Sequence, residues 1–345
     1  MGKCTASENF HRGFGCPSVH VHTAYTKGRY TLPHGKEVRM KGFFQAPWRF
    51  AACYAAFLIA AFTCALLDTF VIPHRELIVS RARDVADEVL ETLAPSATLA
   101  APQAADASFY QDESMSVQLT TLRRDGTTCY VADVRLASPA LLRTALAENT
   151  FGRNVTDTVS ELAGANGAVL AINGDFYGSR KSGWCLRNGV LYRGASASSP
   201  TELLLVDASG DFSIADDRTM TAGDAEGLWQ IFSFGPALVT DGEVSVADGD
   251  EVARSMTSNP RTAIGQIGSL HYAFVVTDGR TEESAGLSLV QLADLMLDIG
   301  CETAYNLDGG GSSTMVFQGK VINNPTTNGR TITEREVSDI VYIGL

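Results

Sequence analysis

Histidine is scarce in the main body of this chain. Four of the six histidines lie within the first 34 residues, and His74 and His271 are the two that follow. The sequence also lacks a Gly-x-Ser-x-Gly segment, the turn on which many hydrolases mount a nucleophilic serine. These two absences argue against a hydrolase of the Ser-His-Asp type.

Cysteine is too sparse and too widely spaced to form a disulfide framework. No two of the seven cysteines have the spacing of a zinc site. In the main body, two alternatives stay open, namely one disulfide or small buried apolar side chains. The cysteines are Cys4, Cys16, Cys53, Cys64, Cys129, Cys185 and Cys301.

Positive charge is also in short supply, except at the start of the chain. The formal net charge is -12, although the first 49 residues carry eight Lys or Arg against two Glu. The remainder is therefore strongly acidic, and its overall field disfavours nucleic acid and anionic membrane surfaces. We expect no nucleic-acid partner, but a local basic pocket for one anionic group remains compatible with this charge.

One long apolar run stands out against this background. Residues 50–67 contain no charged side chain, and Trp48 and Arg49 precede them as interfacial anchors would. The run predicts a transmembrane signal-anchor helix over 47–72. The basic leader places the N-terminus in the cytoplasm and the body outside it. A cleaved signal peptide and a buried core helix are the alternative interpretations.

The rest of the chain divides by composition. We expect a disordered basic cytoplasmic tail over 1–46. Apolar residues at helical spacing from Arg75 to Leu93, followed by an Ala/Pro-rich stretch, predict a stalk helix and linker over 73–109. A single globular domain then covers 110–345. Its fold class is α+β, with a mixed β-sheet and flanking helices.

Local signals place several elements in this domain. Residues 116–123 and 127–136 alternate around Asp125-Gly126, which predicts a hairpin. Thr156 or Asp157 is the expected cap of a short helix that ends near Ala163. Ser288, with Gln291 three residues later, predicts a capped helix that ends at Gly300. Strands are expected at 168–172, 270–277, 303–307 and 337–343.

The chain is organised around Asn306-Leu307-Asp308-Gly309-Gly310-Gly311-Ser312. Three consecutive glycines are costly where only a turn is needed, because each loses much backbone freedom on folding. Their lack of side chains lets another group approach the backbone closely and exposes amide N–H groups. No Gly-Lys-Ser/Thr follows, so this is not a nucleotide P-loop. A plain glycine loop is the alternative.

Three apolar strands each end in a polar segment that contains an acid. The segments are Asn173-Gly-Asp175, Asp278-Gly-Arg280 and Asn306-Leu-Asp308. Parallel strands would bring these ends together at one edge of a sheet, where ligands bind in α/β proteins. Arg261 and Arg280 are the candidate cations for a phosphate or carboxylate, although each could instead form a salt bridge.

The order of these segments resembles the phosphodiester glycosidase family. The similarity covers roughly residues 115–345. It rests on Asn173-Gly-Asp-Phe-Tyr, Ser182-Gly-Trp-Cys, Gly235-Pro-Ala-Leu-Val, Asn259-Pro-Arg-Thr-Ala-Ile-Gly, Asp278-Gly-Arg and Asn306-Leu-Asp-Gly-Gly-Gly-Ser. The resemblance implies hydrolysis of a sugar-1-phosphodiester at the anomeric carbon. The first segment often reads Asn-Gly-Gly-Phe-Phe in that family, so Asp175 replaces a glycine. This difference points Asp175 towards specificity or ion binding.

The roles that the resemblance implies are as follows. Arg261 and Arg280 grip the phosphodiester, and Asp308 or Asp278 acts as base or nucleophile, with Asn306 beside them in the catalytic group. The backbone amides from Gly309 to Ser312 bind phosphate or sugar oxygens. The positions assigned to substrate binding besides the arginines are Asn173, Asp175, Gly309, Gly310, Gly311 and Ser312. No cofactor is assigned, and a Ca²⁺ or Mg²⁺ ion held by oxygen ligands stays open.

The topology and the resemblance together predict a cell-envelope glycan or polysaccharide as substrate. The protein would be a single-pass cell-membrane protein with its catalytic domain outside the cytoplasm. Two alternatives remain. One is a non-catalytic module that binds anionic polysaccharide, and the other is a metal-dependent phosphodiesterase that cleaves the P–O bond.

Overall fold

The computed structural model describes residues 47–78, 104–105, 108–197, 202–247 and 258–344. The chain forms two compact units, Met1–Thr63 and Cys64–Leu345. The predicted tail over 1–46 lies outside the described residues. Most of the predicted linker lies outside them as well.

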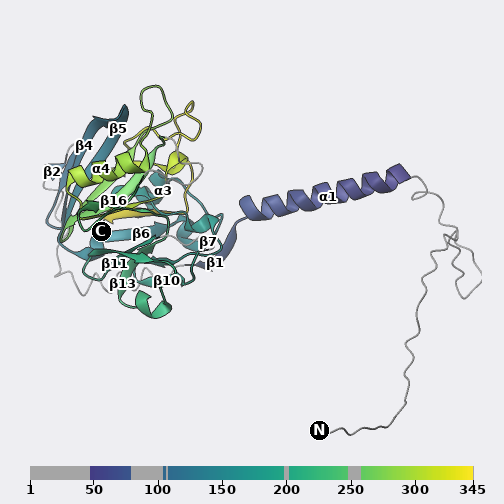
Figure 1. Ribbon diagram of the computed structural model, residues 1–345, viewed down its shortest axis with the longest axis horizontal. Coiled ribbons are helices and arrows are strands. Elements are labelled where there is room, and N and C mark those ends of the chain that lie inside the picture. The colour runs from purple at the N-terminus through teal and green to yellow at the C-terminus, as the bar shows by residue number, and fades with distance from the viewer. Residues whose placement is uncertain (1–46, 79–103, 106–107, 198–201, 248–257, 345) are drawn as a thin grey trace, which may run out of the picture. The chain divides into compact units, whose positions relative to one another are not determined.

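The predicted apolar helix is present as α1, Pro47–Phe70 (Figure 1). Proline at its first residue suits a helix start, because the missing N–H would have no intrahelical partner there. In the described part of the chain, one helix is long and apolar enough to cross a membrane, over Trp48–Phe70. Its described side chains are exposed throughout.

The second unit is built mainly from three sheets. The largest has nine strands in the order β15-β14-β18-β16-β17-β5-β4-β3-β2. In that order the strands are Glu243–Val244, Ala237–Thr240, Thr303–Asn306, Arg261–Gly268, His271–Thr277, Thr127–Leu136, Met115–Arg124, Phe109–Gln111 and Ala104–Ala105.

Two five-stranded sheets and one small pair complete the strands. The first sheet has the order β20-β19-β8-β21-β6, and the second has the order β10-β9-β13-β11-β12. The first contains Lys320–Val321, Met315–Phe317, Ala168–Asn173, Asp339–Gly344 and Leu142–Leu146. The second contains Val190–Arg193, Cys185–Arg187, Leu228–Phe232, Glu202–Asp207 and Phe212–Asp216. β1 (His74–Ile78) pairs with β7 (Thr150–Arg153).

The main core lies where these three sheets face one another. Apolar side chains from each meet in one cluster, among them Phe274 of β17, Ile172 of β8 and Leu204 of β11. Helix α4 (Leu289–Ile299) covers the other face of the nine-stranded sheet. Helix α3 (Val159–Ala165) covers the other face of the β8 sheet. In Figure 1, α4 is seen above β16, and β6, β11 and β13 follow below it.

Most locally encoded elements are confirmed. The hairpin β4–β5 turns at Asp125 and Gly126, which both have positive φ. Ser288 caps α4 through a capping box with Gln291, and Gly300 ends it in the left-handed conformation with φ 97°. The short turns that complete the unit are Pro139–Leu141, Ala147–Asn149, Tyr177–Ser179, Ala222–Ala225 and Gly310–Ser312.

Three expectations need correction. The cap of α3 is Thr158 rather than Thr156 or Asp157, because Thr158 and Glu161 form the capping box. Residues His74–Ile78 form a strand where the spacing predicts a helix, because they pair with β7. The expected mixed sheet is antiparallel in its hydrogen bonding, since every strand pair in the described residues is antiparallel. Strands β17 and β18 do run in the same direction, but β16 lies between them.

Candidate active site

The predicted polar segments converge at one edge of the nine-stranded sheet. Strands β17 and β18 end there, and the antiparallel β16 begins there, with Arg261 opposite Thr277 and Ala263 opposite Asn306. The fourth segment arrives from β8 in another sheet. Asn173 joins the two sheets, because its Nδ2 donates to the Asp308 carbonyl at 2.6 Å and its Oδ1 accepts from Thr262 Oγ1 at 2.8 Å.

These segments border a cleft of about 550 Å³. Its charged lining consists of four arginines and one acid, whereas the chain as a whole is acidic. Apolar side chains and backbone form the rest of the wall. The lining residues are Phe176, Arg180, Phe234, Gly235, Pro236, Asn259, Arg261, Arg280, Leu289, Asn306, Leu307, Asp308, Gly309, Gly310, Gly311 and Arg335.

The three glycines permit close approach, as expected, but the approaching groups belong to the protein. A Cβ on Gly309 would lie 3.0 Å from the Pro260 carbonyl oxygen, and a Cβ on Gly310 would lie 2.8 Å from an Arg280 guanidinium nitrogen. A Cβ on Gly311 would lie 2.3 Å from Thr327 Oγ1. The turn is therefore not a loose loop, because its backbone packs directly against Pro260, Arg280 and Thr327.

Two amides of this turn are already used inside the protein. The Gly310 N–H donates to the Pro260 carbonyl at 2.8 Å, and the Ser312 N–H donates to the Gly309 carbonyl at 3.3 Å. The expected role of these two amides in binding substrate oxygens is therefore not supported. The hydroxyl of Ser312 instead donates to the Asp308 carboxylate.

Asp308 is the one carboxylate among the described residues that line the cleft. Its side chain is 15% exposed, so a ligand can reach it. Ser312 Oγ donates to Oδ2 at 2.5 Å, and Arg335 Nη2 lies 3.3 Å from the same oxygen. Burial raises the pKa of the Asp308 carboxyl, while the Ser312 hydrogen bond and the Arg335 charge oppose that rise.

Arg261 and Arg280 both line the cleft, as predicted. Arg261 is buried, and its Nε donates to the Leu287 carbonyl at 2.8 Å. Arg280 Nη1 donates to the Thr327 carbonyl at 2.7 Å. Arg280 adopts φ 65°, a strained value for a side chain of this size, and strain of this kind is typical of functional sites. Burial and the nearby Arg335 charge lower the pKa of Arg280.

Asn306 contributes an unused acceptor to the cleft. The residue is 4% exposed, and its Nδ2 donates to the Gly235 carbonyl at 2.8 Å. Its buried Oδ1 has no hydrogen-bond donor among the described residues. A buried amide oxygen without a donor is unfavourable, so a substrate hydroxyl or a water would be accepted there readily.

Asp278 and Asn173 lie near the site but support it rather than line the cleft. The Asp278 carboxylate accepts from the Asn324 backbone at 2.8 Å, from Asn324 Nδ2 at 3.0 Å and from Tyr130 OH at 3.2 Å. Burial and the Asp278 charge raise the pKa of Tyr130 to about 12. The geometry thus favours Asp308 over Asp278 as the reacting carboxylate.

Asp175 belongs to a buried ionic cluster. Arg187 Nη2 lies 2.9 Å from Asp175 Oδ1, and Arg187 Nε donates to Asp339 Oδ2 at 2.9 Å. All three side chains are at most 2% exposed. Burial raises the pKa of Asp339 to about 7. Although burial opposes it, the charge of Asp175 holds the pKa of Arg187 well above its ordinary value.

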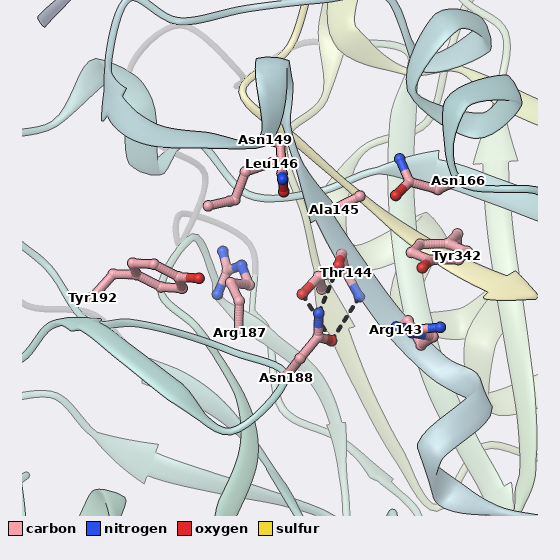
Figure 2. Close-up of a pocket in the computed structure, with 10 residues that line it drawn as sticks. All are labelled: Arg143, Thr144, Ala145, Leu146, Asn149, Asn166, Arg187, Asn188, Tyr192 and Tyr342. Atoms are coloured by element: carbon pink, nitrogen blue, oxygen red, sulfur yellow. Dashed lines mark hydrogen bonds between the residues drawn. The ribbon is translucent and has the colours of Figure 1, made fainter. Parts of the chain in front are cut away.

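Of this cluster, Arg187 also lines a small cavity of about 40 Å³. Figure 2 shows Arg187 there between Tyr192 and Asn188, with Asn188 hydrogen-bonded to Thr144. The cavity has room for about three water molecules. Asp175 Oδ2 accepts from the Ser233 N–H at 3.0 Å, next to the cleft residue Phe234. Asp175 therefore holds the backbone next to Phe234, which lines the cleft.

Sequence reasoning missed two arginines of the cleft. Arg335 contacts Asp308 and Ser312 from a segment without motif or periodicity, so its sequence carries no signal. Arg180 lies seven residues after Asn173, close to a segment that was recognised. Its guanidinium stacks near Phe176 and Phe234 and donates to the Ser233 carbonyl at 2.6 Å.

Among the residues that the structure describes, the cysteines of the second unit form no disulfide with one another. Cys129, Cys185 and Cys301 are buried free thiols, so no disulfide joins them. Burial raises the pKa of Cys129 to about 11. No group of three His, Cys, Asp or Glu side chains that could hold a metal occurs in the described part of the chain.

Comparison with known proteins agrees with the site. Residues 166–344 match the sequence profile of the phosphodiester glycosidase family. The prophage-derived uncharacterised protein YomE of Bacillus subtilis is 32% identical over 180 residues, covering 50% of this chain and 28% of that protein. The bovine N-acetylglucosamine-1-phosphodiester alpha-N-acetylglucosaminidase is 30% identical over 190 residues, covering 49% and 35%.

A solved structure supports the fold. The catalytic domain of the zebrafish N-acetylglucosamine-1-phosphodiester alpha-N-acetylglucosaminidase, auto-inhibited by its pro-peptide, superposes with a TM-score of 0.54 and 18% identity. The match covers 80% of this chain and 97% of that domain. The match shows that the second unit has the fold of this catalytic domain. Because residues 166–344 match the family's sequence profile, this chain belongs to the phosphodiester glycosidase family. It spans about a third of the length of the curated relatives.

Proposed function

We propose that this protein hydrolyses a sugar-1-phosphodiester at the anomeric carbon, releasing the free sugar and a phosphomonoester. The observation that carries the proposal is the cleft itself, which four arginines and one accessible carboxylate line together. Such a concentration of positive charge in an acidic chain suits an anionic substrate. N-acetylglucosamine is the first sugar to test, because the bovine relative is named as an enzyme that acts on its phosphodiesters.

The arginines are assigned to the phosphate. Planar guanidinium groups bind phosphate oxygens with two parallel hydrogen bonds. Arg261 lies at the start of β16 and Arg280 lies in the segment that follows β17, and both line the cleft. As the bond to the anomeric carbon breaks, negative charge grows on the departing phosphate. The same arginines stabilise that charge, so the leaving group needs little protonation.

Asp308 is assigned to the anomeric carbon. Once ionised, it can attack that carbon or remove a proton from an attacking water. Ser312 and Arg335 hold the carboxylate in place. Because the phosphate leaves without a strong acid, one carboxylate in the cleft is sufficient. The unpaired Oδ1 of Asn306 supplies an acceptor for a substrate hydroxyl or the water.

The location and natural substrate form the finer part of the proposal. An apolar helix of 24 residues with basic residues before it would hold the domain on the outer side of a cell membrane. A cell-envelope glycan or polysaccharide with sugar phosphodiesters would then be the substrate. Protease added to intact cells should digest the domain, and full protection until the cells are lysed would refute this orientation.

The test of activity uses the full chain in detergent. N-acetylglucosamine-1-phosphodiesters with small alcohol aglycones are incubated with the protein, with and without a chelator, and the products are identified. Free sugar and phosphomonoester in equal amounts support the proposal. Binding without turnover would favour a polysaccharide-binding module. Turnover that the chelator abolishes and Ca²⁺ or Mg²⁺ restores would favour a metal-dependent phosphodiesterase.

A further inference from the structure

A second cavity adjoins the cleft at Asp308. It has a volume of about 250 Å³, and we call it the rear pocket. Phe176, Asp308 and Arg335 line both the rear pocket and the cleft. These three side chains therefore form a common wall, and the proposed reacting carboxylate lies in that wall.

The two cavities differ in charge. Beyond the shared wall, the cleft is lined by three further arginines, whereas the charged residues of the rear pocket are the acids Asp175 and Glu336. Arg187 balances the charge of Asp175, so Glu336 gives the rear pocket its negative charge. A phosphate is therefore attracted to the cleft rather than to the rear pocket. The occupant of the rear pocket should be neutral.

The polar lining of the rear pocket suits a polyol. Three residues with hydroxyl groups, Thr156, Ser179 and Ser338, line it. Thr156 Oγ1 donates to Glu336 Oε2 at 2.8 Å, which orients that carboxylate at the pocket. Hydroxyls can donate or accept, and a carboxylate accepts, so the lining matches the alternating groups of a sugar ring.

Phe176 adds an apolar surface to this lining. It is 40% exposed, although most large apolar side chains of the second unit are buried. Its ring also lies 5.8 Å from the Arg180 guanidinium of the cleft. An exposed ring at the mouth of a polar pocket can cover the C–H face of a sugar, and burying that face is favourable.

We propose that the rear pocket is the glycosyl subsite, which holds the neutral sugar ring while the cleft holds the phosphate and its aglycone. This inference rests on the proposed function. It places the scissile bond at the common wall, beside Asp308. The volume lies just below the range of about 300–1,000 Å³ typical of ligand pockets, which limits the subsite to one monosaccharide.

Two variants separate the cavities. Ser179 is exposed at the rear pocket, so Ser179→Tyr fills that pocket without disturbing the core. Arg280→Lys removes the planar guanidinium from the cleft. Ser209→Tyr places the same bulk at an exposed turn outside both cavities. The full chain in detergent is titrated separately with N-acetylglucosamine, N-acetylgalactosamine, glucose and inorganic phosphate, and binding is followed by ligand-observed NMR.

The expected result is a selective loss. Ser179→Tyr should weaken sugar binding at least tenfold and leave the phosphate dissociation constant within twofold, and Arg280→Lys should do the reverse. Ser209→Tyr should change neither. Unchanged sugar affinity in Ser179→Tyr, or no saturable binding of any of the three sugars to the wild type, would overturn the proposal.

The same experiment keeps the two proposals apart. Absence of turnover with sugar and phosphate still bound at separable sites would remove the hydrolysis and keep the subsite. Turnover with unchanged sugar affinity in Ser179→Tyr would keep the hydrolysis and remove the subsite.

Discussion

The Asp308 side chain is largely buried but remains accessible to a ligand. Burial and the neighbouring Ser312 and Arg335 side chains together determine the pKa of its carboxyl. Burial raises the pKa of its carboxyl, while Ser312 and Arg335 act in the opposite direction. The proposed chemistry requires the ionised form. Activity should therefore fall as the pH drops through this raised pKa, at a higher pH than for an ordinary carboxyl. In the native state the same shift favours protonation, so ionising Asp308 costs stability as the pH rises.

Asp308→Asn should separate activity from stability. We expect turnover to fall by a factor of about 10²–10⁴, the usual contribution of a positioned acid or base. The melting temperature at pH 7 should be unchanged or higher, because the amide removes the cost of burying a charge. Asp298→Asn, at an exposed acid on α4, is the matched control. Wild-type turnover in Asp308→Asn would refute the assigned role.

Arg335→Ala should move the pH profile. Arg335 opposes the rise in the pKa of Asp308, so its removal should shift the acid limb of the activity profile to higher pH. The exposed Arg330 lies in the same segment, and Arg330→Ala should leave the limb in place. Profiles of kcat/KM against pH would measure both. A shift to lower pH in Arg335→Ala would contradict the account.

Among the elements, the glycine turn couples local structure most directly to the site. Gly310 has φ 63°, and its Cα faces the Arg280 guanidinium. Gly319 has φ 74°, but a Cβ added there would meet no neighbouring group within 4 Å. The two positions therefore share backbone strain and differ in the neighbour.

Gly310→Ala and Gly319→Ala should accordingly differ in activity. Each should cost about 1 kcal/mol of stability, because alanine is strained at positive φ. Only Gly310→Ala should weaken phosphate binding, since its methyl group displaces Arg280. Urea unfolding would measure the stability of both variants, and titration with phosphate would measure their phosphate affinity. Equal phosphate affinity in the two variants would argue against a close contact between Gly310 and the Arg280 guanidinium.

Local sequence signals predicted the elements well where the structure is also local. The β4–β5 turn and the cap of α4 depend on neighbouring residues, and both were confirmed. The strand His74–Ile78 depends on pairing with a partner more than seventy residues away, and helical spacing could not reveal it. Arg335 was missed for the same reason, because only the tertiary fold brings it to Asp308.

At the scale of the whole molecule, the site is assembled from two sheets. Its convergence was expected from parallel strands, yet the pairing is antiparallel, and the same edge is reached because β16 starts where β17 and β18 end. Asn173 was expected to bind substrate, but it joins the sheets. Motif order thus predicted which segments meet, whereas side-chain roles depended on packing that a single sequence does not encode.

The buried Asp175–Arg187–Asp339 cluster should stabilise this assembly. Arg187→Leu leaves two buried acids without their partner, and removing one member of such a pair costs about 3–5 kcal/mol. The loss should be smaller at pH 5 than at pH 7.5, because the pKa of Asp339 is already raised to about 7 and protonation removes its charge.

Urea unfolding at the two pH values would measure this dependence. Arg218→Leu is the control, because Arg218 is 70% exposed and its loss should be nearly neutral. A larger loss at pH 5 than at pH 7.5 would contradict the assigned electrostatics.

The most direct test of the central claim is the position of bond cleavage. The full chain in detergent is incubated with an N-acetylglucosamine-1-phosphodiester in oxygen-18 water, and the products are read by phosphorus NMR and mass spectrometry. Cleavage at the anomeric carbon predicts label in the sugar and an unlabelled phosphomonoester. Label in the phosphomonoester would show P–O cleavage and contradict the account.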